Sequence, residues 1–304
     1  MIEKVLKIGS RKSALALRQT ELFIQSFRTY YPTLSISFQI IPQETSGDRY
    51  GAERLSDIGG KGLFTKELDA SLLRGDIDLA IYSLKDVETV LQDNITIACV
   101  LERGDARDVF ISKNAISLQD LPLGAIIGTA SPRRQSQLLN YRPDLRIRLI
   151  RGNVPTRLEK LQTEDFDGTL LALAGLQRLE LEDVLTEVLD PECFVPAAGQ
   201  GALVACIRKD RQDVESLLAP LNHHPTQQCI TAERALLRAL GASCRTPVGA
   251  YATKTSLGIR LKGFLGTEDG GRVSRIAEEG ADPLVLGERV AFELKRLLGS
   301  PCSF

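Results

Sequence analysis

The stretch from Arg133 to Arg157 contains seven arginines, no lysine and one acidic residue, Asp144. The whole chain is nearly neutral, with 38 basic and 39 acidic residues, so this concentration is local. Arginine has a planar guanidinium group that donates two parallel hydrogen bonds to a carboxylate or phosphate, whereas lysine is a point charge. The stretch therefore predicts a ligand with several planar anionic groups. A solvated basic helix surface is the alternative interpretation.

The beginning of this stretch has the pattern of a helix start. Ser131 is a preferred N-cap residue, and Pro132 follows it at the first helical position. The backbone N–H groups of such a first turn point toward an anion, and Arg133 and Arg134 lie beside them in the sequence. This arrangement favours the ligand-binding interpretation.

Two other residues are candidates for direct chemistry. Asp86 follows Lys85, and a carboxylate kept ionised by nearby cations can stabilise a cationic intermediate or transfer a proton. Capping the next turn is the commoner role of a single aspartate. Cys244 precedes Arg245, and a neighbouring arginine favours the nucleophilic thiolate. A buried structural cysteine is the commoner alternative.

Glycine-rich segments give weaker signals. Residues 59–62 (GGKG) lack the serine or threonine of a phosphate-binding loop, and residues 199–201 (GQG) lack the third glycine of a dinucleotide site. The polar stretch 45–62 is long for a loop in a compact domain. We interpret it as a mobile lid, with a plain surface excursion as the alternative.

The elements that must position these residues alternate between strand and helix. Strands are expected at residues 5–8, 34–41, 77–84, 125–127, 147–150, 169–172 and 202–207, and helices at 14–27, 65–74, 135–140, 157–162 and 176–179. This alternation predicts mainly parallel sheets covered by helices. Residues 219–225 resemble a linker. The helix 227–240, the strands 259–265 and 272–277 and the helix 284–298 then predict a small α+β domain.

Polar clusters directly follow four of the expected strands. These clusters are residues 10–11, 85–86, 129–134 and 151–153. In open parallel sheets, ligands bind outside the carboxyl ends of the strands. The position of the clusters therefore predicts one binding site at the sheet edges.

Bulk composition excludes several classes of protein. A chain of 304 residues predicts two or three domains, and its net charge of -1 argues against a nucleic-acid or membrane-surface binder. Tyr141 is the single aromatic residue in the arginine stretch, so stacking platforms for bases are absent from it. The chain shows no export signal or apolar span, and we expect a cytoplasmic protein. Six cysteines without a C-x-x-C pair and two adjacent histidines predict free thiols and no metal site.

Several motifs together resemble one enzyme family. They are residues 9–16 (GSRKSALA), 59–67 (GGKGLFTKE), 83–86 (SLKD), 128–135 (GTASPRRQ), 151–158 (RGNVPTRL) and 196–202 (PAAGQGA). In this order they closely resemble the porphobilinogen deaminases, also called hydroxymethylbilane synthases. The resemblance covers nearly the whole chain and extends to the region of Cys244.

The resemblance implies two type II periplasmic-binding-protein-like α/β domains and a small C-terminal α+β domain. Domain 1 would comprise residues 1–101 and 201–219, with the lid at 45–62. Domain 2 would comprise residues 106–196, and domain 3, with the cofactor-attachment cysteine, residues 224–304. The chain would cross back into domain 1 near Gly201.

The resemblance also implies the chemistry. Such enzymes condense four porphobilinogen molecules head to tail on a covalent dipyrromethane cofactor, lose ammonia at each step, and release hydroxymethylbilane by hydrolysis. Asp86 would be catalytic, assisting ammonia loss and stabilising positive charge on the azafulvenium and pyrrole nitrogen. Cofactor-binding residues would be Cys244 (through a thioether), Lys85, Ser83, Thr129, Ser131, Arg133, Arg134, Arg157 and Gln200; substrate-binding residues would be Arg11, Ser13, Phe64, Arg151 and Arg178.

Four positions depart from the family pattern. Tyr82 replaces a usual histidine, Glu88 a usual proline, Asp57 a common lysine, and Pro132 a common leucine. We expect these changes to affect lid closure and pyrrole positioning more than the chemistry. The expected protein is a metal-free monomer that binds porphobilinogen and neither nucleic acid nor membrane. A non-catalytic polycarboxylate-binding or sensing protein of the same fold is the alternative.

Overall fold

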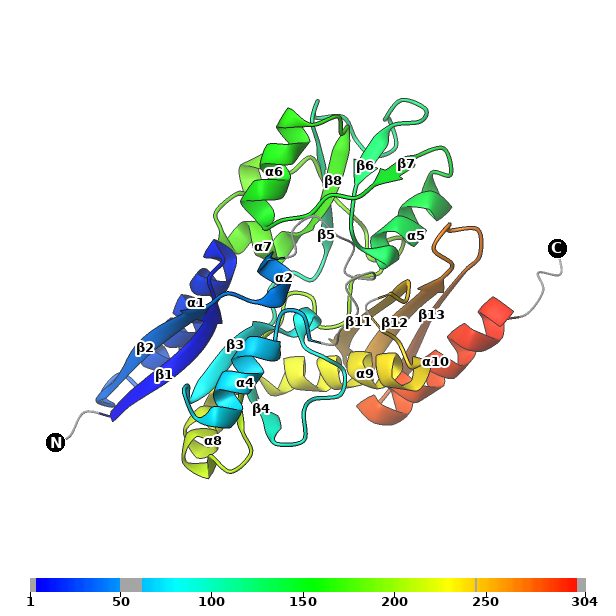
Figure 1. Cartoon of the computed structure of the whole chain (residues 1–304). Helices are drawn as coiled ribbons and strands as arrows, with labels where there is room; N and C mark the ends of the chain where they lie inside the picture. The colour runs from blue at the N-terminus through cyan, green and yellow to red at the C-terminus, as the bar shows by residue number, and fades with distance from the viewer. Residues whose placement is uncertain (1–3, 50–61, 244, 300–304) are drawn as a thin grey trace. The chain divides into compact units, whose positions relative to one another are not determined.

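The computed structural model describes residues 4–49, 62–243 and 245–299, which fall into two compact units (Figure 1). Unit 1 comprises Met1–Gly104 and Ala202–Gln227, and unit 2 comprises Asp105–Gly201 and Gln228–Phe304. The chain therefore leaves unit 1 after Gly104, returns to it at Ala202, and passes into unit 2 a second time after Gln227.

Unit 1 is built on one mixed sheet. Its elements are β1 (Lys4–Arg11), α1 (Ala14–Tyr30), β2 (Ile36–Gln43), α2 (Ser46–Arg49), α4 (Lys66–Arg74), β3 (Leu79–Ser83), the 3-10 helix η1 (Leu84–Asp86), β4 (Ile95–Val100), β10 (Leu203–Arg208), α8 (Gln212–Leu218) and η3 (Ala219–Leu221). Among the described residues, the strand order is β2-β1-β3-β10-β4. The pairs of β1 with β2 and β3 are parallel, whereas β10 runs antiparallel to both of its neighbours.

Helix α1 covers one face of this sheet. Ser13 caps its start by accepting a hydrogen bond from the backbone N–H of Ala16. Phe23 and Phe27, four residues apart on one side of the helix, are buried in a core with Leu6 and other strand residues. Burying a side chain such as phenylalanine contributes roughly 1.5–3 kcal/mol, so this face fixes α1 on the sheet.

Unit 2 contains a second mixed sheet with the same layout. Its elements are β5 (Asp108–Ser112), β6 (Ile126–Gly128), α5 (Pro132–Tyr141), β7 (Arg146–Arg148), α6 (Val154–Thr163), β8 (Gly168–Ala172), α7 (Leu173–Arg178), η2 (Glu182–Val184) and β9 (Glu187–Val188). In the described part of the unit the order is β7-β6-β8-β5-β9. Strand β6 is parallel to β7 and β8, and β5 is antiparallel to β8 and β9.

A separate antiparallel sheet completes unit 2. Strands β11 (Val248–Thr255), β12 (Gly258–Gly266) and β13 (Val273–Gly280) pair in chain order, and α9 (His224–Leu240) and α10 (Pro283–Gly299) pack on them (Figure 1). Leu236 of α9 and Val290 of α10 both approach Gly263 of β12, so the two helices share one face of the sheet. The small residue leaves room for both side chains.

These observations confirm the predicted fold class and correct parts of the predicted detail. The sheets are mixed rather than mainly parallel, because β10 and β5 each run antiparallel to both of their neighbours. Strand β10 was predicted, whereas β4, β5 and β9 were not. The linker expected at residues 219–225 is instead the 3-10 helix η3 followed by the start of α9 at His224. Pro225 lies in the first helical turn, where its missing N–H group costs nothing.

Candidate functional site

In unit 1, Arg11 and Asp86 meet at the edge where β1 and β3 end. The two strands are parallel neighbours, with Ile8 opposite Leu79, so their carboxyl ends lie at the same edge. The Arg11 Nη1 atom is 3.7 Å from the Asp86 Oδ2 atom, and both side chains are partly exposed. The distance is that of an ion pair rather than of a tight hydrogen bond. Because the Asp86 side chain is partly exposed, its carboxylate remains accessible.

The guanidinium group of Arg11 also lies over an aromatic ring. Its Cζ atom is 4.3 Å from the ring centroid of Phe64. A cation over the face of an aromatic ring is attracted by the ring quadrupole, by about 0.5–1 kcal/mol at partly exposed sites. Phe64 therefore helps to orient Arg11 toward Asp86.

The other predicted residues of unit 1 have local partners. Ser13 caps α1, and the Ser83 hydroxyl is 2.9 Å from the Gln19 Nε2 atom, which joins β3 to α1. Lys85 is exposed on η1. Ser83 is thus the last residue of β3, and Lys85 and Asp86 follow it in η1. The observed end of β3 lies one residue before the predicted end of the strand at residue 84.

Carboxylates flank the predicted lid on both sides. Glu67 accepts hydrogen bonds from the backbone N–H and the hydroxyl of Ser46, and Glu88 accepts one from the backbone N–H of Gly62 at 2.7 Å. Most of the predicted lid, including Asp57, lies outside the described residues. Glu88, where the family pattern has proline, thus has a specific backbone partner at the end of that segment.

In unit 2, Arg133 and Arg134 point into the protein and share one carboxylate. Arg133 Nη1 is 2.6 Å from Asp108 Oδ2, and Arg134 Nη2 is 2.7 Å from Asp108 Oδ1. Both arginines are buried, and Gln200 donates to Asp108 from a third direction at 2.9 Å. The interpretation of this part of the arginine stretch as a solvated helix surface is therefore wrong.

The helix start that precedes these arginines is as predicted. Ser131 accepts the backbone N–H of Arg134 at 3.4 Å, and Pro132 occupies the first turn. Thr129 in turn accepts the backbone N–H of Ser131 at 3.1 Å. Thr129 and Ser131 thus fix the backbone from which Arg133 and Arg134 extend.

The segment that carries Gln200 is fixed by a buried glutamate. Glu233 of α9 accepts the backbone N–H of Gly199 with one oxygen, at 2.7 Å, and that of Ala252 in β11 with the other, at 2.8 Å. The carboxylate therefore joins three parts of unit 2. The position of Gln200 depends on this junction.

The remaining arginines of the stretch do not form one surface. Arg142 pairs with Asp144 at 2.7 Å and donates to backbone carbonyls between residues 118 and 122. Arg148 lies over the ring of Phe166, and Arg146 is exposed. Arg142 and Arg148 thus have structural partners, and the prediction of a single anion-binding band was too broad.

Arg151, Arg157 and Arg178 lie near glycine-containing turns of unit 2. Arg151 is buried, and Arg157 donates to the Gly152 carbonyl at 2.8 Å. Arg178 donates to the Gly201 carbonyl at 2.6 Å, and burial lowers the pKa of Arg178 to about 10. It still carries its charge at neutral pH.

Cys244 lies outside the described residues. Its neighbours form a turn in which the backbone N–H of Ser243 donates to the Thr246 hydroxyl and that of Arg245 donates to the Ser243 hydroxyl. The turn connects α9 to β11.

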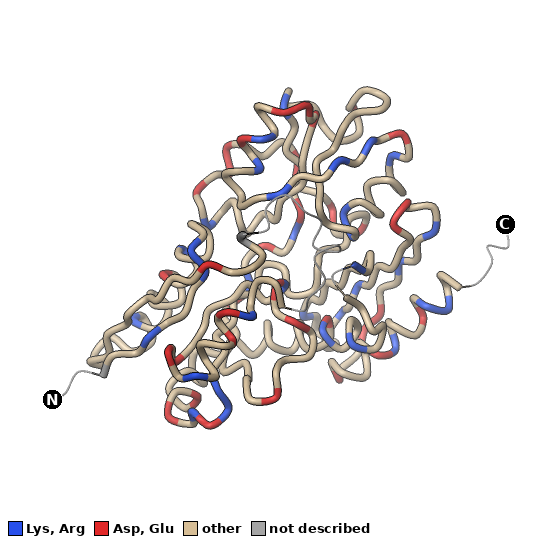
Figure 2. The backbone as a smooth tube through the Cα atoms, in the orientation of Figure 1, with Lys and Arg blue, Asp and Glu red and all other residues tan. Residues whose placement is uncertain are grey.

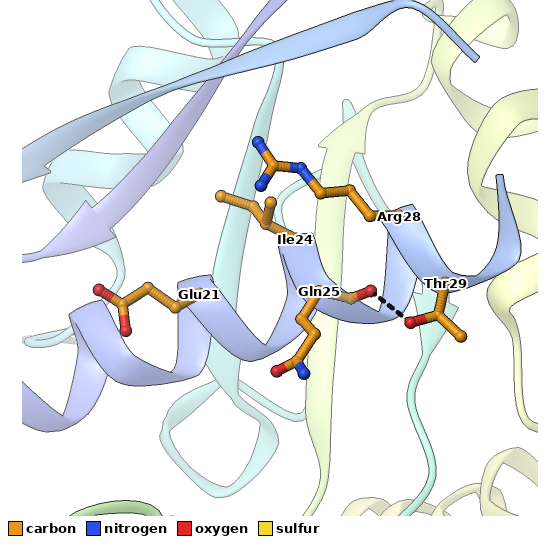
Figure 3. A pocket seen from close by; sticks show the side chains of 5 residues that line it. All are labelled: Glu21, Ile24, Gln25, Arg28 and Thr29. Carbon is orange, nitrogen blue, oxygen red and sulfur yellow. Dashed lines mark hydrogen bonds between the residues drawn. The ribbon is translucent and has the colours of Figure 1, made fainter. Parts of the chain in front are cut away.

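A hollow on α1 is lined by Glu21, Ile24, Gln25, Arg28 and Thr29, all from one helix (Figure 3). Basic and acidic residues are interspersed along the chain (Figure 2). Within residues 4–49, 62–243 and 245–299, no helix is long and apolar enough to cross a membrane and no His/Cys/Asp/Glu cluster could hold a metal.

Asp108 is the residue of this region that sequence reasoning missed. It opens the buried strand β5, whose following residues Val109, Phe110 and Ile111 are all apolar. A charged residue at the start of such a run is a detectable signal, since buried carboxylates occur when they are paired. Its partners lie at least 25 positions away in the sequence, so the pattern alone does not name them.

Comparison with known proteins places these features in a family. Residues 6–216 match the family model described as porphobilinogen deaminase, dipyromethane cofactor binding domain, and residues 227–296 match that of the porphobilinogen deaminase C-terminal domain. The porphobilinogen deaminase of Staphylococcus carnosus is 44% identical over 292 residues, which cover 95% of this chain and 94% of the relative. That of Bacillus subtilis is 42% identical over 290 residues, covering 95% and 92%.

Among solved structures, a TRAP periplasmic solute-binding protein from Desulfovibrio salexigens aligns with a TM-score of 0.44 and 12% identity, covering 72% of each chain. The family models together span most of the sequence and include Asp86 in the first match and Cys244 in the second. The chain belongs to the porphobilinogen deaminase family.

Proposed function

We propose that this protein condenses four porphobilinogen molecules head to tail, with loss of ammonia at each step, and releases hydroxymethylbilane by hydrolysis. Family membership supports this enzyme over a non-catalytic binding protein. The observation that carries the proposal is the half-buried Asp86 carboxylate, held 3.7 Å from Arg11 at the shared end of two parallel strands. The protein would therefore be a transferase of porphyrin and heme biosynthesis.

In this proposal, Asp86 provides a fixed negative charge for the positive charge that develops on the substrate as ammonia leaves. It can also receive or deliver a proton at the amino group. Arg11, stacked on Phe64, binds a substrate carboxylate beside Asp86. Ser13 and Ser83 hold α1 and β3 in place around this pair.

The donor chemistry of unit 2 fits the dipyrromethane cofactor of the family, whose pyrroles carry acetate and propionate groups. Arg133 and Arg134 are planar donors for such carboxylates, and Arg151, Arg157 and Arg178 supply further ones. Cys244 would hold the cofactor through a thioether, with Lys85, Thr129, Ser131 and Gln200 as polar contacts. When bound, the cofactor supplies the pyrrole carbon to which the first substrate is joined.

Intact mass spectrometry tests the proposal. The purified chain should be heavier than its sequence by a dipyrromethane, or become so after treatment with porphobilinogen. Cys244→Ser should abolish this increment. Cys193→Ser, at an exposed free cysteine of the same unit, should keep it. A wild-type mass equal to the bare sequence after porphobilinogen treatment would refute the proposed function.

We also propose the finer organisation that the family resemblance implies. The three domains would be residues 1–101 with 201–219, residues 106–196, and residues 224–304, and the three separate sheets support this division. We further propose a cytoplasmic, metal-independent monomer. Light scattering during gel filtration, and turnover measured with and without a chelator, test the last two statements.

A further inference from the structure

Asp108 is a fully buried carboxylate at the start of β5, and its surroundings compensate its charge. An isolated buried carboxylate is strongly unfavourable, so its partners must supply both charge and hydrogen bonds. Asp108 Oδ2 accepts a hydrogen bond from Arg133 Nη1 at 2.6 Å. Asp108 Oδ1 accepts hydrogen bonds from Arg134 Nη2 at 2.7 Å and from Gln200 Nε2 at 2.9 Å. One side chain therefore contacts three residues that the family resemblance assigns to cofactor binding.

Each guanidinium group is held at two places. Besides their bonds to Asp108, Arg133 Nη1 donates to the Val195 carbonyl at 2.8 Å, and Arg134 Nη1 donates to the Leu170 carbonyl at 2.8 Å. A planar group fixed by two acceptors cannot rotate without breaking one of them. Asp108 is the acceptor that both arginines share, so it sets their orientation relative to each other.

These contacts do not use every N–H donor of the two buried guanidinium groups. An arginine has five N–H donors, and three hydrogen bonds are formed by each of Arg133 and Arg134 within the described part of the chain. The remaining donors can serve a carboxylate ligand without release of Asp108.

The cluster also has a defined charge. Burial alone would raise the pKa of Asp108, but Arg133 and Arg134 outweigh this effect and hold the pKa below its ordinary value. Asp108 is therefore ionised at neutral pH, and the two arginines with one carboxylate carry a net charge of about +1. A second buried carboxylate, from a ligand, would neutralise the cluster.

We propose that Asp108 is a positioning residue that aligns Arg133, Arg134 and Gln200 for carboxylate binding and lowers their combined charge to match one ligand carboxylate. This inference rests on the proposed function. It predicts that substitution of Asp108 weakens capture of the pyrrole carboxylates during cofactor assembly, even though Asp108 itself does not contact the reacting atoms.

The test uses the full-length apoprotein, with porphobilinogen as the probe. Cofactor assembly is followed by intact mass as a function of porphobilinogen concentration. Asp108→Asn should raise the half-saturating concentration about tenfold, because the two guanidinium groups lose the shared acceptor that aligns them toward the ligand carboxylate. Asp105→Asn, which removes a carboxylate from the partly exposed pair with Arg107, should behave as the wild type.

A purely structural role would reduce the fraction of protein that assembles cofactor and leave the half-saturating concentration unchanged; that outcome overturns the proposal. If Asp108→Asn does not fold, Asp108→Glu keeps the charge and shifts the carboxylate by one methylene. It should show the same increase, and a wild-type concentration dependence would again overturn the proposal. Failure of the wild type to gain mass would instead refute the proposed function itself.

Discussion

The hydroxyl of Tyr82 donates a 2.7 Å hydrogen bond to the Oδ1 atom of Asp69. This contact joins β3, which leads directly to Asp86, to helix α4. Burial raises the pKa of Asp69, and hydrogen bonds from Tyr82 and Thr65 oppose that effect. Tyr82, which replaces the usual histidine of the family pattern, thus serves as the donor to a partly desolvated carboxylate.

Tyr82→Phe should lower the free energy of unfolding by about 1–3 kcal/mol, because it leaves the Asp69 carboxylate without this donor. Folding favours the protonated form of Asp69, because its pKa is raised in the folded state. The stability that this protonated form contributes is present in acid and is lost as the pH rises through the folded-state pKa. The loss caused by Tyr82→Phe should therefore be larger at neutral pH than in acid. Urea unfolding at several pH values measures it. Tyr30→Phe, at an exposed tyrosine, is the control.

Asp86→Asn should lower kcat by roughly 100-fold or more, because the amide can neither take a proton nor balance developing positive charge. The mass increment of the cofactor should be retained in protein that already carries it. Asp93→Asn makes the same charge change at an exposed turn of unit 1 and should leave kcat unchanged. Single-turnover assays make the comparison, and kcat within a few-fold of the wild type would contradict the role of Asp86.

Arg11→Lys should raise KM for porphobilinogen by about tenfold, because lysine keeps the charge but loses the planar donor stacked on Phe64. Arg18→Lys, at a partly exposed position on α1, is the matched control. Steady-state kinetics measures both variants. An unchanged KM in Arg11→Lys would mean that charge alone is sufficient at this position.

Gly249→Ala should destabilise unit 2 by about 1–3 kcal/mol. A Cβ atom at Gly249 would lie 2.7 Å from the Val195 carbonyl oxygen, which accepts the Arg133 hydrogen bond. At Gly280 the nearest atom to an added Cβ, in Leu286, is 3.5 Å away, so Gly280→Ala is the control. Thermal unfolding compares the variants. Equal melting temperatures would show that the backbone at Val195 can shift to accommodate the added Cβ atom without loss of stability.

The acid stability of the protein should depend on Asp108. Its pKa is lowered in the folded state, so its contribution is present above the unfolded pKa of about 3.9 and is lost as the pH falls toward the folded value. The wild-type free energy of unfolding should therefore decrease below about pH 4, and Asp108→Asn should show a shallower decrease. Denaturant titrations in this range measure the slopes, and equal slopes would contradict the assignment.

Local signals in the sequence predicted much of the framework. Ser131 with Pro132 correctly indicated the start of α5, and strand β1 and helix α1 were predicted from their apolar spacing. Strands β4, β5, β9 and β11 were missed. The strand β5 is only five residues long and opens with Asp108, which interrupts an otherwise apolar pattern. Its identity as a strand depends on pairing with β8 and β9, far away in the chain.

The candidate site was predicted less completely for the same reason. Residue types and positions after strands were sufficient to select Arg11 and Asp86. They could not distinguish Arg133, which is buried on a carboxylate, from Arg142, which holds a loop through backbone carbonyls. That distinction arises from tertiary contacts between segments that the local pattern does not relate.

The place of β10 in the first sheet has a consequence for biosynthesis of the chain. Strand β10 lies between β3 and β4 and supplies the described ladder partner of β4, yet it is made about a hundred residues after β4. When only Met1–Gly104 has been synthesised, the position between β3 and β4 in this sheet is therefore still empty. The first segment to be synthesised must wait for the intervening part of unit 2 before its own core can close.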